Sequence, residues 1–202
     1  SIFLKRRLKT VVGFHTRNVP HRGHEWIHQY GLKKCNALFI HPLIGQYKKK
    51  EYKEKAIIKG NLKLIKSIYK NKNVIFGLLN SYPRYAGPRE ALFHALIRKN
   101  YGCTHFMLGR DHAGVGKYYT KYESQKLCIK YEKYLKVKII SFKEPYFCTS
   151  CKKVINKCNH RKNNKIFISG KKIRNLIFSG KKIPGKLMRK QISKTLSKSS
   201  II

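Results

Sequence analysis

The sequence predicts an α/β fold in which a mainly parallel β-sheet carries helices on both faces. Short apolar runs rich in β-branched and aromatic residues alternate with longer segments whose apolar residues recur every three or four positions. Strands that alternate with helices in this way form parallel sheets. The chain of 202 residues is 42% hydrophobic, which supplies material for a real core.

Five apolar runs have the length and composition of strands, and the segments between them have helical spacing. The predicted strands are residues 10–14, 37–40, 73–78, 104–108 and 137–142. The predicted helices are residues 24–32, 52–69, 88–99 and 122–135, with a short terminal helix expected over 184–196. We expect residues 1–142 to form the α/β domain and residues 143–202 to form a C-terminal part with a basic tail.

Polar, glycine-bearing segments follow the first four strands. In parallel sheets, ligands bind beyond the carboxyl ends of the strands, so these segments are the expected binding edge. They are residues 15–24, 41–47, 80–89 and 109–119.

The first of these segments reads HTRNVPHRGH and runs from a strand into a helix. His21 and His24 are three residues apart at the helix start, so both imidazoles project from the first turn, where free amides favour an anion. Gly23 between them allows a nucleotide to approach the backbone. The alternative, two solvated histidines near a helix start, is weakened because Arg17, Asn18 and Arg22 crowd the same loop.

Three later segments carry related chemistry. Residues 82–90 place Pro88 and Glu90 at a helix start, with arginines at positions 84 and 89. Residues 109–116 contain three glycines and Asp111, the single aspartate of the chain, which we expect to orient its neighbours. In residues 168–174, Ser169 can cap a helix whose free amides suit phosphates. An ordinary turn or capped helix is the alternative for the first and third of these segments.

The charge is strongly basic: 47 Lys and Arg against 8 Asp and Glu give a formal net charge of +39. Two explanations stay open from composition alone, a lysine-rich coding bias at the surface and a nucleic-acid surface. No run of 18 apolar residues occurs and the first ten residues lack a signal peptide's apolar stretch. We therefore expect a cytoplasmic protein with no membrane partner.

Three of the six cysteines cluster in one short segment. Cys148, Cys151, Cys158 and His160 form the pattern C-x2-C, six residues, C-x-H. Four such ligands suit a closed structural zinc site, although the C-x-H spacing is tighter than usual and a chance cluster is the alternative.

Taken in order, HTRNVPHRGH, HPLIG, RYAGPREALFHALIRKNYGCTHF, GRDHAGVG and ISGKKIR resemble the catalytic domain of ATP sulfurylase, a member of the HxGH nucleotidyltransferase superfamily. The resemblance implies a Rossmann-like nucleotidyltransferase domain over nearly all of residues 10–190. Family members usually carry an amino-terminal domain before this one, and here the first strand comes almost at once. The family's reaction converts ATP and sulfate into adenosine 5′-phosphosulfate and pyrophosphate, with Mg²⁺ accompanying the nucleotide.

The resemblance also implies roles for individual residues. Catalytic roles fall on Thr16, Arg17, Asn18, His21 and His24. ATP contacts fall on His15, Thr16, Arg17, Asn18, Gly109, Arg110, Asp111, His112 and Pro145. Sulfate contacts fall on His15, Arg17 and Ala113. This sequence departs from the family where His15 replaces the usual Gln and where Lys171 occupies a position often held by Thr.

The chemistry of the motifs agrees with this reaction. Sulfate is already a dianion at neutral pH, so it needs no general base, and the motifs contain no paired carboxylates. Arginines, histidines and amides stabilise the charge on the phosphates. Two alternatives stay open: the same fold acting on another oxyanion, and a non-catalytic basic protein that binds nucleic acid. We expect no specific nucleic-acid partner, and homo-oligomerisation is left open.

Overall fold

The computed structural model describes residues 2–45 and 49–202, so positions 46 and 47 of the expected loop 41–47 lie outside the described residues. The chain forms two compact units. The first contains Ser1–Thr16, Tyr30–Leu43 and Lys72–Glu144, and the second contains Arg17–Gln29, Ile44–Asn71 and Pro145–Ile202. Each unit is therefore discontinuous in sequence.

The first unit is built on a five-stranded parallel sheet with strand order β4-β2-β1-β6-β7. Its strands are β1 (Val11–Phe14), β2 (Ala37–Ile40), β4 (Val74–Phe76), β6 (His105–Leu108) and β7 (Lys138–Ser141). All five predicted strands are confirmed. The sheet starts in its centre and grows first to one side and then to the other, which is the Rossmann-like order.

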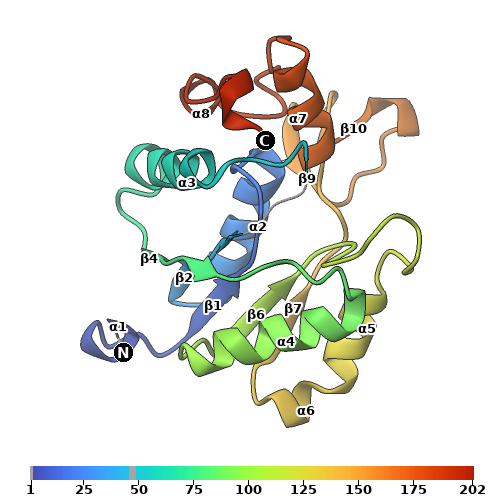
Figure 1. Ribbon diagram of the computed structural model, residues 1–202. Coiled ribbons are helices and arrows are strands. Elements are labelled where there is room, and N and C mark those ends of the chain that lie inside the picture. Colours follow the sequence, from blue (N-terminus) through green and yellow to red (C-terminus); the bar gives the residue numbers. More distant parts are fainter. Residues whose placement is uncertain (1, 46–48) are drawn as a thin grey trace. The chain divides into compact units, whose positions relative to one another are not determined.

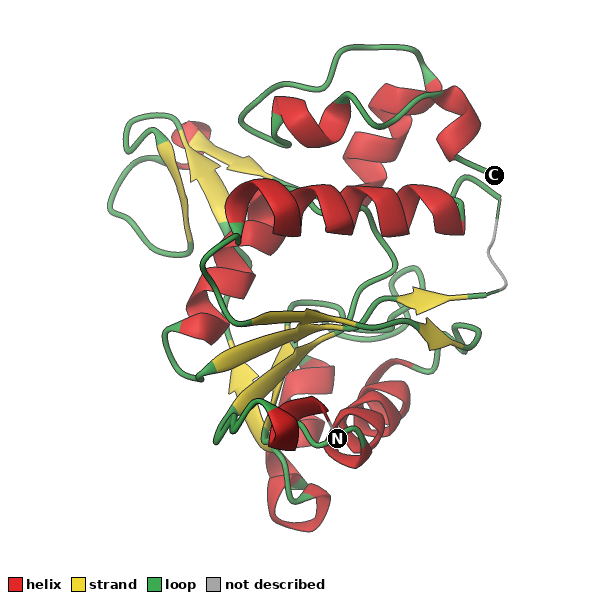
Figure 2. Ribbon diagram, turned by 90° about the vertical axis from the view of Figure 1, so that its left-hand side faces the viewer, coloured by secondary structure: helices red, strands yellow, loops and turns green. Residues whose placement is uncertain are grey.

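Helices cover both faces of this sheet. They are α1 (Ile2–Lys5), α4 (Gly87–Asn100), α5 (Glu123–Lys130) and α6 (Glu132–Leu135), together with the end of α2 (Arg22–Leu32). On one face, Ala91 and Ala95 of α4 pack on Phe106 and Leu108 of β6. Figures 1 and 2 show this layer of helices lying along the strands. On the other face, a Cβ at Gly31 of α2 would lie 2.7 Å from the Met107 sulfur, so that helix approaches the sheet closely.

The second unit combines the first turns of α2 with α3 (Glu54–Ile68), α7 (Gly170–Phe178), α8 (Lys190–Ser193) and a small antiparallel sheet. That sheet has the order β10-β8-β9, from β8 (Tyr146–Cys148), β9 (Lys153–Ile155) and β10 (Lys165–Phe167). Two 3₁₀ turns, η1 (Lys162–Asn164) and η2 (Lys198–Ser200), complete it. A short pair, β3 (Leu43–Ile44) with β5 (Leu79–Asn80), forms a third sheet.

Two helix predictions need correction. The segment 122–135 is divided between α5 and α6 at Tyr131, and Lys136 ends it in a left-handed conformation. The terminal helix expected over 184–196 is wrong, because only Lys190–Ser193 is α-helical. The chain is extended at Arg189, which lets the Leu187 carbonyl accept from the Arg22 amide. In the described part of the chain, no helix is long and apolar enough to cross a membrane.

Six of the eight carboxylates of this basic chain make contacts within the fold, and two of them, Glu25 and Glu90, are buried. Glu25 pairs with Arg189, Glu51 with Arg17 and Glu144 with Arg110. Three more accept backbone amides: Glu90 from Arg84 and Ala86, Glu123 from Thr120, and Glu132 from Ile139. Lysines, in contrast, occupy mainly exposed positions. The few negative charges therefore serve internal contacts.

Gly13, in the centre of β1, is required by close packing. A Cβ there would lie 2.6 Å from Cγ of Arg98 and 3.3 Å from Sγ of Cys103. We expect Gly13→Ala to lower the free energy of unfolding by about 1–3 kcal/mol through overpacking. Urea denaturation measures this. Gly185→Ala is the control, since no described atom lies within 4 Å of a Cβ there, and its change should stay within about 0.5 kcal/mol. Equal effects of the two variants would contradict the packing argument.

Candidate functional site

In the first unit, the loops after β1 and β6 bring His15 and His112 together. Their ring centroids are 5.2 Å apart, and His15 also stacks on His94 of α4 at 3.9 Å. His94 Nδ1 lies 3.0 Å from His112 Nε2. Two segments separated by nearly one hundred residues therefore present imidazoles at one edge of the sheet, as the topology predicts.

The loop after β6 is tightly folded. Asp111 and Ala113 both have positive φ, 54° and 58°. A Cβ at Gly114 would meet a carboxylate oxygen of Asp111, so a side chain there would displace that carboxylate. The Ser124 hydroxyl donates to the His112 carbonyl at 2.9 Å. Two left-handed residues and the hydrogen bond from Ser124 thus define the conformation of this loop.

Arg110, at the start of this loop, makes an ion pair with Glu144 at 3.0 Å. Burial raises the pKa of Glu144, and the charges of Arg110 and Lys121 oppose that effect. Gln125 of α5 donates to the carbonyls of Leu108 and Phe142, at 2.8 and 2.9 Å. These bonds tie together the ends of two neighbouring strands.

Helix α4 begins at a left-handed Gly87, where a Cβ would collide with the Tyr119 ring. Glu90 accepts the amides of Arg84 and Ala86 at 3.0 Å each, so it closes the loop onto the first turn. One turn later, His94 Nε2 lies 3.5 Å from Glu90 Oε1, and both side chains are 1% exposed. Glu90 thus lies at the helix start, as expected, and also contacts His94, which packs against His15 and His112.

In the second unit, the loop after β1 enters α2 through a histidine pair in which His21 is buried and His24 is half-buried. The rings of His21 and His24 stack at 3.7 Å, and the His24 amide donates to His21 Nδ1 at 3.2 Å. Burial lowers the pKa of His21 to about 4, partly offset by a backbone hydrogen bond. The pKa of His24 is lowered by burial and then by the charges of His21 and His28. Both imidazoles are therefore neutral at pH 7.

Helix α7 starts beside this loop. Ser169 caps it by accepting the Lys172 amide at 3.2 Å, as predicted. Arg174 Nη1 donates to Asn18 Oδ1 at 2.5 Å, and a Cβ at Gly170 would collide with the same amide. The loop that leads into α2 and the start of α7 therefore lie next to each other, and a helix start suits phosphate oxygens.

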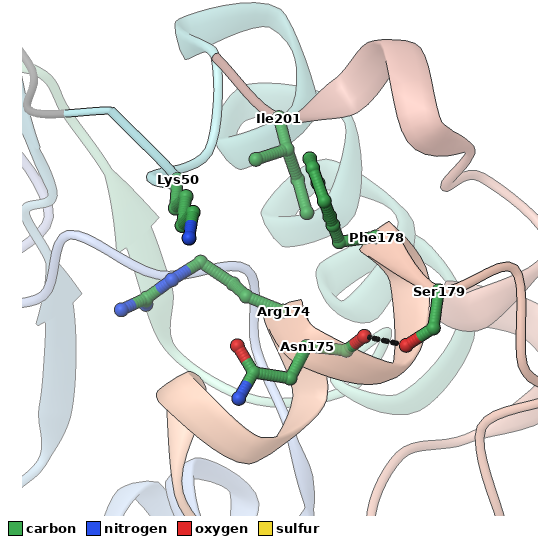
Figure 3. A pocket seen from close by; sticks show the side chains of 6 residues that line it. All are labelled: Lys50, Arg174, Asn175, Phe178, Ser179 and Ile201. Carbon is green, nitrogen blue, oxygen red and sulfur yellow. Dashed lines mark hydrogen bonds between the residues drawn. The ribbon is translucent and has the colours of Figure 1, made fainter.

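Arg17 lies in the same unit, with Nη1 3.4 Å from Glu51 Oε1. Arg174 also lines a pocket of about 340 Å³ together with Lys50, Asn175, Phe178, Ser179 and Ile201. Figure 3 shows the basic side chains of this pocket on one side and Phe178 and Ile201 on the other. Arg17 thus lies close to Glu51, and Arg174 lies close to Asn18.

The cysteine cluster is assembled around the small sheet of the second unit. Ligand atoms of Cys148, Cys151, Cys158 and His160 all lie within 4.8 Å of one another. The His160 Nδ1 atom lies 3.5 Å from Cys148 Sγ and 3.3 Å from Cys151 Sγ. Three soft sulfurs and one imidazole can hold a metal ion, and this donor set matches the sequence prediction in every residue.

The predicted site residues are divided between the two units. The first unit contains His15, Thr16, Gly109, Arg110, Asp111, His112 and Ala113, and the second contains Arg17, Asn18, His21, His24 and Pro145. The Thr16 carbonyl accepts the Leu43 amide at 2.9 Å, and Thr16 and Pro145 are buried. Sequence reasoning missed His94 and Arg98. The spacing of four residues from Glu90 to His94, and again from His94 to Arg98, on one helix is the signal that could have found them.

Comparison with known proteins gives one family. The family model described as ATP-sulfurylase matches residues 1–199. The sulfate adenylyltransferase of Hyperthermus butylicus is 39% identical over 193 residues, covering 95% of this chain and 49% of the relative. That of Carboxydothermus hydrogenoformans is 39% identical, covering 97% and 52%, and that of Pyrococcus abyssi is 40% identical, covering 95% and 51%. The chain spans about half the length of the curated relatives it matches.

A likeness to a solved structure concerns the fold alone. The hexameric APS kinase from Thiobacillus denitrificans superposes with a TM-score of 0.73 at 15% identity, covering 96% of this chain and 37% of that chain. The mixed α/β architecture with a parallel central sheet is therefore one that solved proteins share.

Proposed function

The chain belongs to the ATP-sulfurylase family, and on this premise we propose that it transfers the adenylyl group of ATP to sulfate, giving adenosine 5′-phosphosulfate and pyrophosphate. The observation that carries the proposal is the contact between the starts of α2 and α7, where Arg174 holds Asn18. The contact places Arg174 beside the loop that carries Arg17 and the neutral His21 and His24, and arginines and imidazole donors favour a polyphosphate. The direction of the reaction in the cell is left undetermined.

The proposed chemistry needs charge stabilisation rather than proton transfer. A sulfate oxygen attacks the α-phosphorus, its bond to phosphorus forms, and the bond from phosphorus to the bridging oxygen of the leaving pyrophosphate breaks. Arg17 orients sulfate with its guanidinium fork, and Glu51 holds Arg17 at 3.4 Å. Because His21 Nδ1 accepts from the His24 amide, a neutral His21 carries its proton on Nε2 and donates to a phosphate oxygen.

The remaining contacts follow the family pattern. We propose that Thr16, Asn18 and His24 act with Arg17 and His21 in catalysis. The nucleotide is proposed to contact His15, Gly109, Arg110, Asp111, His112 and Pro145, and sulfate to contact His15, Arg17 and the Ala113 backbone. Mg²⁺ bound with ATP neutralises phosphate charge. Since six of the eight carboxylates already have partners in the fold, phosphate oxygens and water are its expected ligands.

A pyrophosphate-release assay tests the proposal. The full chain is incubated with ATP and Mg²⁺ and then with sulfate, with molybdate or with no oxyanion. Release that depends on sulfate supports it, release with another oxyanion only favours a different substrate, and no release under any condition contradicts enzymatic activity. The functional division into residues 1–142 and 143–202 and a homo-oligomeric assembly are further proposals.

We propose zinc as the metal of the Cys148, Cys151, Cys158 and His160 cluster. Four protein ligands fill a tetrahedral shell, so the ion stabilises the small sheet and takes no part in the reaction. Strand β8 carries the first ligand, and β9 and β10 both pair with β8. Zinc at this position would fix the register of all three strands.

We expect one zinc per chain and loss of thermal stability when a chelator removes it. Cys151→Ser should lose the ion and lower the melting temperature by on the order of 10 °C, since binding energy at such sites is folding energy. Metal analysis and calorimetry measure both. Cys128→Ala is the matched control, because this buried thiol packs in the core of the first unit and should leave zinc content unchanged. Protein purified under reducing conditions without zinc would contradict the proposal.

A further inference from the structure

The segment from the end of α7 to η2, in the second unit, encloses a pocket of about 590 Å³ with an apolar floor. The floor consists of four aliphatic side chains, those of Ile177, Ile183, Met188 and Leu196. Ile177 and Met188 are buried, whereas Ile183 and Leu196 are half-buried and reach the surface. None of the residues that line this pocket is one of the predicted site residues. The pocket is therefore a feature separate from the proposed reaction.

Five lysines border the apolar floor, and all of them are exposed. They are Lys181, Lys182, Lys190, Lys194 and Lys198, and together with the floor they define the lysine-rimmed pocket. Among the described residues that line it there is no carboxylate. Like charges gathered around one opening repel one another, so this place favours a partner that carries several negative charges.

The backbone around the lysine-rimmed pocket is held by contacts within the second unit. Arg22 Nε donates to the Gly185 carbonyl at 3.2 Å, and the Arg22 amide donates to the Leu187 carbonyl at 2.9 Å. At left-handed Gly180, a Cβ would lie 3.5 Å from Cε of Lys198, so the two ends of the segment lie against each other. A pocket that is already formed loses less conformational entropy when a partner binds.

A second copy of this chain does not suit the lysine-rimmed pocket. The chain has eight Asp and Glu against 47 Lys and Arg, and six of the eight already make contacts within the fold. A second copy would bring lysines against lysines, and the repulsion between like charges opposes such an interface. The complementary partner is therefore a different, acidic molecule.

Nucleic acid suits the lysines but not the floor. Proteins that bind single strands stack the bases on aromatic rings, and base edges in duplexes are read mainly by Arg, Asn and Gln. The described residues that line this pocket include no aromatic ring and none of these three side chains. An aliphatic floor instead accepts aliphatic side chains, as in the grooves that bind amphipathic helices.

We propose that the lysine-rimmed pocket docks an acidic amphipathic helix of a partner protein. Aliphatic side chains on one face of that helix, spaced i, i+3, i+4 and i+7, enter the pocket and cover its floor. Carboxylates on the flanking positions pair with the five lysines. The apolar contact supplies affinity, and the charges select acidic partners and speed association.

Fluorescence anisotropy of the full chain with a fluorescein-labelled peptide of about 18 residues tests the proposal. The peptide carries leucines at i, i+3, i+4 and i+7 on one helical face and glutamates on the other. A scrambled peptide has the same composition and charge but no apolar face. At an ionic strength of about 0.15 M, we expect the scrambled peptide to bind about tenfold more weakly. Equal affinity of the two peptides would overturn the proposal, because charge alone would then explain the binding.

Matched substitutions locate the binding site. Lys182→Glu combined with Lys194→Glu reverses two rim charges and should weaken binding of the amphipathic peptide by about tenfold or more. Lys99→Glu combined with Lys133→Glu is the control, since these exposed lysines line another pocket, of about 720 Å³, in the first unit. Its affinity should stay within about threefold of wild type. Ile183→Ser leaves every charge in place and should weaken binding about fivefold through loss of apolar contact.

Thermal melts of all three variants confirm that each one is folded. Equal losses of affinity in the rim variant and in the control variant would overturn the proposal, because binding would then follow net charge. Oligonucleotides that bind more tightly than the peptide, and that are weakened by the rim variant but not by Ile183→Ser, would establish a nucleic-acid surface instead. Phosphatidylglycerol vesicles that capture the wild type but not the rim variant, with no binding of the peptide, would establish a lipid surface instead.

Discussion

Arg17→Ala should reduce turnover of ATP and sulfate by about a thousandfold while leaving the melting temperature nearly unchanged. The reason is geometric. Arg17 is partly exposed and is held by Glu51 at 3.4 Å, so its removal leaves the core intact but leaves sulfate without a fork that aligns it for attack. Initial rates of pyrophosphate release, together with a thermal melt, measure the two effects separately.

Arg17→Lys separates the effect of the positive charge from the effect of the guanidinium geometry. Lysine keeps the charge but offers a point donor, so it should recover only part of the rate. Lys63→Ala, an exposed lysine of α3 in the same unit, controls for loss of one positive charge and should stay within twofold of wild type. If Arg17→Lys kept the wild-type kcat and the wild-type KM for sulfate, the assignment of Arg17 would be wrong.

For His21 and His24, alanine substitutions are expected to lower kcat by about a hundredfold to a thousandfold, with a smaller change in the KM for ATP. Negative charge grows on the phosphates only as the transition state forms, so the donors contribute most at that point. Burial keeps the pKa of His21 at about 4, which makes it a neutral donor across the physiological range. Steady-state kinetics with both substrates varied separates the two parameters.

His105→Ala serves as the matched control for the histidine pair. His105 lies at the start of β6 in the first unit, where its ring contacts the Thr104 hydroxyl at 2.8 Å, and its loss should leave kcat within twofold. Variants of His21 and His24 that only raise the KM for ATP would restrict these residues to ground-state binding. A fall in the melting temperature similar to that of Gly13→Ala would point to packing, since His21 is buried.

The regular part of the fold could be predicted from the sequence because local patterns decide it. All five strands of the parallel sheet and the helices α2, α3 and α4 follow apolar periodicity, and the Ser169 cap fixes the start of α7. The interruption of the terminal helix could not be predicted, since Arg189, where the chain is extended, contacts Glu25, more than 160 residues earlier. The three-stranded sheet has strands of only three residues, too short for a pattern to show.

For the functional site too, local patterns predict only part of what the structure shows. Loops, cysteines and histidines could be named because residue type and spacing carry their chemistry. The direction of each hydrogen bond could not, because it depends on contacts such as Arg98 with His15, 83 residues apart. Arg98 also occupies a position in α4 that would ordinarily be apolar, and only the fold shows that its two Nη atoms contact two carbonyls and an imidazole.

The internal use of the carboxylates has a consequence for behaviour in solution. A chain with a formal charge of +39, whose few carboxylates mostly make specific contacts within the fold, has few left to neutralise its lysine-covered exterior. Mutual repulsion among these lysines opposes the compact state. Dissolved salt screens this repulsion between charges more than about 10 Å apart at 0.1 M ionic strength. Ionic strength therefore acts on this protein as a stabiliser, the opposite of its effect on proteins held together by exposed ion pairs.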